Sequence, residues 1–267
     1  MTRVIEKIFS FDRFFKYFKY DLINAKSNFG LSALILGFLP LMVFIIGNLF
    51  SLIFTGKWAE TAGTAFSGMA MGATFIISSI IIGVKLYGSL TDKKAGSNWI
   101  MIPASSFEKF LSMFLIVFVI APVCLAAMLL ISDMILKIFP GYTSITSYFN
   151  KFAGTLAESG MKVNILAMIW HMWCQYAMAF LLGAIIFKKA KVAKTILWMF
   201  IISTVFSIVL TRIIGLTNLP EIFIKDMADV TVSTVQSKVN WFLNICWIGW
   251  AVILGGGIFW RLKTIKH

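Results

Sequence analysis

Charged residues are scarce in this chain of 267 residues: Asp, Glu, Lys and Arg together make up 13%, against about 25% in an average soluble domain. Apolar side chains take their place, at 60% of the sequence, and the mean hydropathy is +0.90. Too few polar residues remain to cover a globule in water. The composition therefore excludes a water-soluble enzyme and a disordered chain, and it predicts a protein whose surface lies mostly in lipid.

The residues that build metal sites and disulfide frameworks are also few. The chain has two histidines, His171 and His267, and three cysteines that all lie in apolar runs. An intramembrane metalloprotease needs two histidines and an acidic partner at helical spacing, and this pattern is absent. The glycine-rich phosphate-binding loop of ATPases is absent from the sequence as well. We therefore predict no catalytic residue, no metal site and no cofactor in this chain.

What the sequence does contain is six apolar runs long enough to cross a bilayer. They cover about residues 31–54, 62–86, 107–131, 164–187, 195–214 and 241–259. Segments on the N-terminal side of the membrane carry 17 of the 24 Lys and Arg residues, and the opposite side carries 7. By the positive-inside rule, both termini are predicted to be cytoplasmic. This topology accounts for nearly all of the net charge of +13, so we predict no nucleic-acid partner.

The predicted fold is an all-α polytopic membrane protein, with one six-helix transmembrane domain over 31–259 and a basic cytoplasmic tail over 260–267. Residues 1–30 place aromatic and aliphatic side chains at helical spacing, with Lys and Arg between them. This pattern predicts a cytoplasmic amphipathic helix that lies in the membrane interface, on anionic lipid, before the chain turns into the first span. A basic flank that only sets the topology is the alternative.

Three polar residues inside the predicted spans are candidates for a polar path, because polar groups in lipid are costly and often functional. They are Asn48 in the first span, and His171 and Gln175, which lie one turn apart in the fourth. Hydrogen bonding between helices explains Asn48 equally well. A structural histidine near the interface, next to Trp170 and Trp173, is the alternative for His171.

Small residues recur every four positions in the second predicted span, at Thr64, Gly68 and Gly72, and Ser79 and Gly83 extend a related pattern. A stripe of this kind lets another helix approach closely. The partner is either another helix of the same chain or a second subunit.

The longest cytoplasmic interruption between spans is the loop between the second and the third. Ser105 followed by Glu108 three residues later is a capping-box pattern, which predicts the start of the third span. Pro103 ends whatever precedes it, and the short apolar stretch from Trp99 to Ile102 favours a small surface or interfacial helix. A capped helix start with an interfacial tryptophan accounts for most of these residues, and docking of another protein stays open.

The sequence resembles one transporter family. The run Ile102–Phe110, IPASSFEKF, is similar to the proline-alanine-serine and glutamate-lysine signature of permease-like proteins common in Bacteroidetes. The six spans, the cytoplasmic ends, the amphipathic N-terminal segment and the loop between spans two and three resemble the membrane subunits of ABC type-2 exporters. The segment 215–240 is long enough for the membrane-dipping helices of that family, but its acidic residues suit a surface helix equally well.

The resemblance implies a multi-pass permease subunit in a bacterial inner membrane, without an ATPase site of its own. Two such chains, as a homodimer or heterodimer, would join separate ABC ATPase subunits that hold ATP and Mg, and would export substrate by alternating access. The residues implied to dock the ATPase are Thr91, Asp92, Lys93, Lys94, Trp99, Pro103, Ser105, Ser106, Glu108 and Lys109. The alternative is a membrane protein without a motor: an immunity, sensor or assembly factor, or a passive channel.

Overall fold

The structure, a computed structural model, describes residues 9–58, 60–91, 96, 99, 101–139, 142, 144, 147, 154, 165–216 and 232–264. Every regular element in these residues is helical, which confirms the all-α class. Five stretches of the described residues are long and apolar enough to cross a membrane: Phe11–Thr55, Ala70–Thr91, Ser106–Leu136, Ile169–Ile186 and Lys191–Val209. The sixth predicted span, 241–259, falls within a helix whose side chains are described only in part.

The first helix, α2 (Phe11–Thr55), is continuous over 45 residues. The predicted turn between the N-terminal segment and the first span does not occur in it. A single glycine at Gly30 does not interrupt a helix, and the buried face continues past it, from Phe14 through Phe29 to Leu36. The helix ends where Gly56 adopts a left-handed conformation (φ 65°) and its N–H donates to the carbonyl of Leu52 at 3.0 Å.

The second helix, α3 (Glu60–Tyr87), packs along α2 and α8 and continues into a short 3-10 turn, η1 (Gly88–Thr91). The space next to its small residues differs along the helix. A Cβ added at Gly83 would lie 2.8 Å from the backbone nitrogen of Leu181, whereas one at Gly72 would meet nothing within 4 Å. The close helix approach therefore occurs at Gly83. Thr64 and Gly68 lie in a stretch of α3 whose side chains are outside the described residues.

The third span is α5 (Ser106–Leu115), a π-helical turn η2 (Ile116–Ile120) and α6 (Ala121–Leu136), which follow one another without a break. The wide turn precedes Pro122, which has no N–H and cannot bond to the carbonyl of Val117 as a π-turn requires. The indole Nε1–H of Trp173, on α8, donates to that carbonyl instead, at 3.1 Å. A side chain from a neighbouring helix thus satisfies the carbonyl that the proline leaves unpaired.

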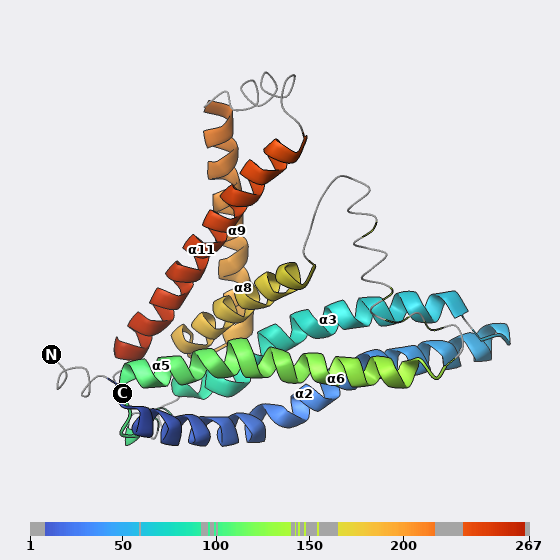
Figure 1. The fold of residues 1–267 in the computed structure, drawn as a ribbon, viewed down its shortest axis with the longest axis horizontal. Helices are drawn as coiled ribbons and strands as arrows, with labels where there is room; N and C mark the ends of the chain where they lie inside the picture. Colours follow the sequence, from blue (N-terminus) through green and yellow to red (C-terminus); the bar gives the residue numbers. More distant parts are fainter. Residues whose placement is uncertain are drawn as a thin grey trace.

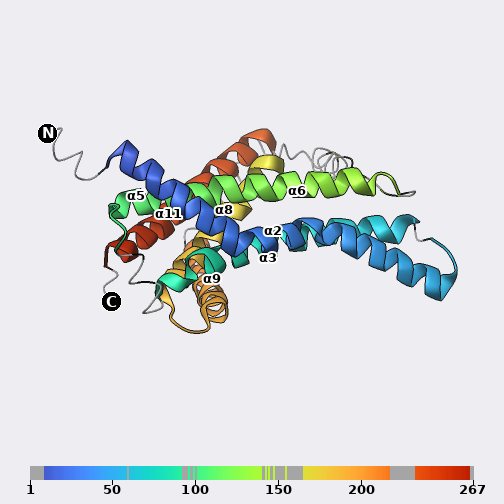
Figure 2. The same cartoon turned by 90° about the horizontal axis from the view of Figure 1, so that it is seen from below.

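The remaining helices are α8 (Ile165–Ile186), α9 (Lys191–Leu216) and α11 (Val232–Thr264). α8 packs against α3, α9 and α11, and its buried face follows a four-residue spacing through Trp173, Ala177, Leu181 and Ile185. α2, α3 and the α5–α6 helix run side by side, while α9 and α11 rise away from them (Figures 1 and 2). The start of α2, the start of α5 and the end of α11 lie at one end of the molecule, which we call the base (Figure 1).

Candidate functional site

The loop before α5 ends in a capping box at the base. Ser105 is in an extended conformation, and its hydroxyl accepts the backbone N–H of Glu108 at 3.2 Å. The Glu108 carboxylate in turn accepts the backbone N–H of Ser105 at 2.8 Å. Two N–H groups that the first helical turn leaves without partners are thereby satisfied. The predicted capping box is confirmed, and α5 begins at Ser106, next to the apolar run expected from about residue 107.

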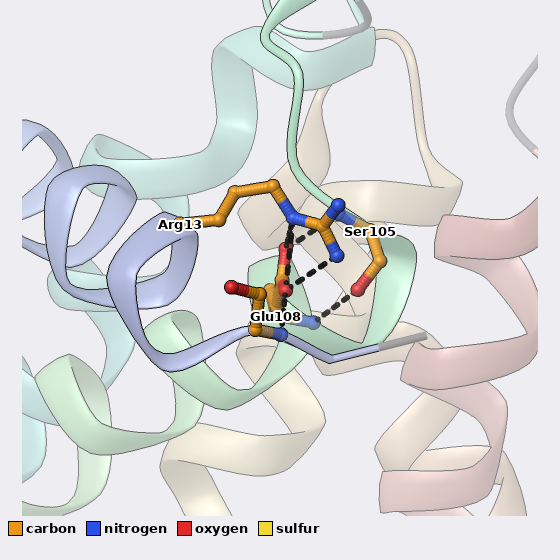
Figure 3. Close-up of polar contacts among 4 residues, drawn as sticks. Arg13, Ser105 and Glu108 are labelled. Atoms are coloured by element: carbon orange, nitrogen blue, oxygen red, sulfur yellow. Dashed lines mark hydrogen bonds and ion pairs between the residues drawn. The ribbon is translucent and has the colours of Figure 1, made fainter. Parts of the chain in front are cut away.

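The same carboxylate also holds the start of α2 (Figure 3). Glu108 accepts the backbone N–H of Ser10 at 2.8 Å, and Arg13 donates to both of its oxygens, from Nε and Nη2, at 2.8 Å each. The Glu108 side chain is fully buried, whereas that of Arg13 is 36% exposed. A buried carboxylate is stable only when donors replace its hydration. Glu108 meets this need with groups that lie 95 or more residues earlier in the sequence.

One turn further along α2, a second contact joins the helix to the loop. The indole Nε1–H of Trp99 donates to the hydroxyl of buried Tyr17 at 3.0 Å. The ammonium of Lys109 donates to the backbone carbonyl of Trp99 at 2.8 Å and lies 4.4 Å from the centre of its ring. Carbonyl and ring face together compensate a cation that is only 5% exposed. Trp99 is thus bonded on one side to α2 and on the other to α5.

A third contact lies one turn further again. Asp21, 5% exposed, accepts the hydroxyl of Tyr87 on α3 at 2.9 Å and that of Ser112 on α5 at 2.7 Å. It therefore links three helices at the base. The sequence analysis did not identify Asp21. Its signal was the four-residue interval between Arg13, Tyr17 and Asp21, which places all three side chains on one face of α2.

We call this set of contacts the clamp. Its members are Ser10, Arg13, Tyr17, Asp21, Tyr87, Trp99, Ser105, Glu108, Lys109 and Ser112. The contacts at positions 13, 17 and 21 extend over about 12 Å of α2, at 1.5 Å per residue. The hydroxyl–carboxylate contacts of the clamp, those of Ser112 and Tyr87 with Asp21, are buried between helices. The arrangement of the clamp is mechanical, because it fastens the loop before α5 to the first turns of α2.

The structure changes the interpretation of four residues implied to dock a partner. Glu108 and Lys109 are buried, so they cannot offer their side chains to another protein. Ser105 is engaged in the capping box and Trp99 is half-buried between Tyr17 and Lys109. These residues hold the loop in place rather than form its outer surface.

The outer surface of the loop comes from its other residues. Met101 is 78% exposed and Phe107 is 42% exposed, and Pro103 is exposed between them. Ser106 is half-buried, and Thr91 is half-buried with its hydroxyl on the carbonyl of Gly88 at 3.0 Å. Asp92, Lys93 and Lys94 lie outside the described residues.

The three residues of the candidate polar path do not share one environment. Asn48 is fully buried in α2 and donates to the carbonyl of Phe44 on its own helix at 3.0 Å, while its Oδ1 has no partner among the described residues. His171 is exposed on α8 and Gln175 is half-buried one turn away. The Asn48 side chain hydrogen-bonds within its own helix and not, among the described residues, to either of them.

A separate polar contact lies at the opposite end of the third span from the clamp. Asp133, only 3% exposed, pairs with Lys137 at 3.0 Å and accepts the hydroxyl of Tyr142 at 2.8 Å. Aromatic side chains including Phe139 gather around this contact, so the carboxylate is shielded from water while the Lys137 side chain stays 48% exposed.

No family model, no curated protein and no solved structure matches this chain. Within the described residues, no group of three or more His, Cys, Asp or Glu side chains is placed to hold a metal ion. The clamp therefore has to be interpreted from its own contacts, and those contacts are mechanical.

Proposed function

We propose that this chain is the membrane permease subunit of an ATP-driven ABC exporter and has no catalytic residue of its own. The observation that supports this proposal is the clamp. The loop and the start of α5 are together bonded to α2 at three successive turns, and this arrangement is suited to passing the movement of a partner protein to that helix. The resemblance of Ile102–Phe110 to the permease signature supports the same function independently of these contacts.

The transmission follows from the packing around α2. Because Glu108 and Trp99 bind α2 at two different turns, the loop cannot move away from this helix without breaking partly buried hydrogen bonds. α2 packs against α3 and α6 along its length, so its displacement shifts the contacts between spans. Packed helices exchange between discrete arrangements, which is the basis of alternating access.

In this proposal the partner is a separate ATPase that carries ATP and Mg, and it contacts the exposed side chains of Met101, Pro103 and Phe107. Two permease chains, identical or different, would form the transport path in a bacterial inner membrane, with both termini and the base on the cytoplasmic side. Lipid surrounds the remaining apolar surface of the spans.

The test is purification of the tagged full-length chain in mild detergent, with mass spectrometry for a stoichiometric ATPase and an assay of ATP hydrolysis in the eluate. We expect Met101→Asp to remove the ATPase from the eluate, because it places a charge in the docking surface. Ile138→Asp is the matched control. Ile138 is an apolar residue that is 81% exposed at the far end of the third span, so the ATPase should remain.

Two results would count against the proposal. Recovery of the chain alone from several mild detergents would favour a membrane protein without a motor, namely an immunity, sensor or assembly factor or a channel. Retention of the ATPase in both variants would show that the docking surface lies elsewhere on the molecule.

A further inference from the structure

An apolar groove of about 300 Å³ lies between α5, η2, α8 and α11. Every described side chain that lines it is apolar, including Phe114 and Phe118 on one wall, Met178 on the second, and residues from Ile248 to Ile258 on α11. Its volume is at the lower end of the range for small-molecule sites. This lining suits a hydrocarbon ligand, because no polar side chain among the described residues faces the groove.

The length of the groove matches one leaflet of a bilayer. Ile248 and Ile258 are ten residues apart on α11, which corresponds to about 15 Å along the helix axis. The hydrocarbon core of a bilayer is about 30 Å thick, so the groove extends over half of it. Two residues that line the groove, Ile248 and Val252, are 64% and 66% exposed, so an acyl chain can enter it sideways from the membrane.

Just beyond the end of the groove nearest the base lies a cation with one buried, unpaired donor. Arg261 follows Ile258 by one helical turn on the same helix, in the last turn of α11. Its Nε is buried and has no hydrogen-bond partner among the described residues. A buried guanidinium donor without an acceptor is costly, and phosphate is an acceptor that the planar guanidinium binds with two parallel hydrogen bonds.

From these observations we propose that the groove binds one acyl chain of an anionic phospholipid and that Arg261 binds its phosphate headgroup. The hydrocarbon lining selects the chain, the length places it in the leaflet on the side of the base, and the cation selects the charged headgroup. This site does not depend on the proposed transport function, because it is made entirely by this chain.

The test measures phospholipid binding to the intact chain in detergent by native mass spectrometry, with phosphatidylglycerol and phosphatidylcholine as probes. We expect Arg261→Gln to weaken phosphatidylglycerol binding by roughly tenfold or more, as for loss of a charge-assisted hydrogen bond, with a smaller loss for phosphatidylcholine. Lys263→Gln is the matched control, because Lys263 is an exposed cation in the same turn. Equal losses in both variants would overturn the assignment of the headgroup to Arg261.

A second pair of variants tests the chain-binding groove itself. Gly255 lines the groove and an added Cβ there meets nothing within 4 Å, so Gly255→Leu fills the groove without a backbone clash. We expect it to reduce binding of both lipids by roughly tenfold. Gly256→Leu is the control, since Gly256 has the same free space and does not line the groove. Ala251→Leu is a second variant that fills the groove. Unchanged lipid binding in both variants, when they are folded, would overturn the proposal.

Discussion

Replacement of Glu108 by alanine tests whether one buried carboxylate fastens the loop to α2. The variant removes the acceptor for two backbone N–H groups, those of Ser10 and Ser105, and for the guanidinium of Arg13. The hydroxyl of Ser105 still caps the helix. The start of α5 should therefore persist, while its connection to the start of α2 is lost.

The expected cost follows from the groups left unpaired. A partly buried N–H that loses its acceptor costs about 1–3 kcal/mol, and two are affected, although water enters the space that the side chain vacates. We therefore expect a loss of about 2–4 kcal/mol, which exceeds the 0.5–2 kcal/mol typical of an isolated helix cap. Arg13 adds little to this figure, because its exposed guanidinium turns to water.

Hydrogen exchange of the intact chain in detergent measures this loss locally. We expect backbone amides in residues 10–16 to exchange about 30 to 700 times faster in Glu108→Ala, as a loss of 2–4 kcal/mol requires. Asp12→Ala is the matched control, because Asp12 is an exposed acid in the same first turn of α2. Equal exchange in the two variants would refute the reasoning, since the carboxylate would then contribute nothing to holding α2.

Two further predictions concern the clamp and the packing of α3. Tyr17→Phe should lower the stability of the folded chain by about 1–3 kcal/mol, because the indole N–H of Trp99 loses its acceptor. The thermal midpoint in detergent should fall accordingly. Tyr20→Phe is the control, because Tyr20 is 56% exposed and its replacement should leave the midpoint unchanged. A similar midpoint for both would contradict the assigned hydrogen bond. Gly83→Ala should lower the stability of the folded chain by about 1–3 kcal/mol, because its Cβ clashes with the backbone of Leu181. A Cβ at Gly72 meets nothing within 4 Å, so Gly72→Ala should be neutral or stabilising by up to about 1 kcal/mol in the same assay. Equal effects of the two alanines would place the close helix contact elsewhere.

Local features of the site could be predicted from the sequence because they depend on residues a few positions apart. The capping box is one of them: Ser105 and Glu108 are three residues apart, and the structure forms both of its hydrogen bonds. The Asp133–Lys137 ion pair is another, at helical spacing. The burial of the Asp133 carboxylate could not be predicted, since Tyr142 and the aromatic side chains around it come from outside its own turn.

The partners of Glu108 and Trp99 could not be predicted in the same way. Arg13 is 95 residues from Glu108, and Tyr17 is 82 residues from Trp99. Both residues of α2 were interpreted as parts of an amphipathic surface helix, because periodicity identifies a polar or apolar face without naming what that face contacts. Asp21 was missed for the same reason.

The class of this protein follows from the sequence alone, because scarce charge and long apolar runs require helices in lipid, where hydrocarbon cannot hydrogen-bond to an exposed backbone. The start of α5 follows from the sequence as well, because capping is a contact within one turn. The continuity of α2 and the contact of its first turns with Glu108 depend on how the helices pack. Such contacts depend on which helices lie side by side, and no pattern within one helix carries that information.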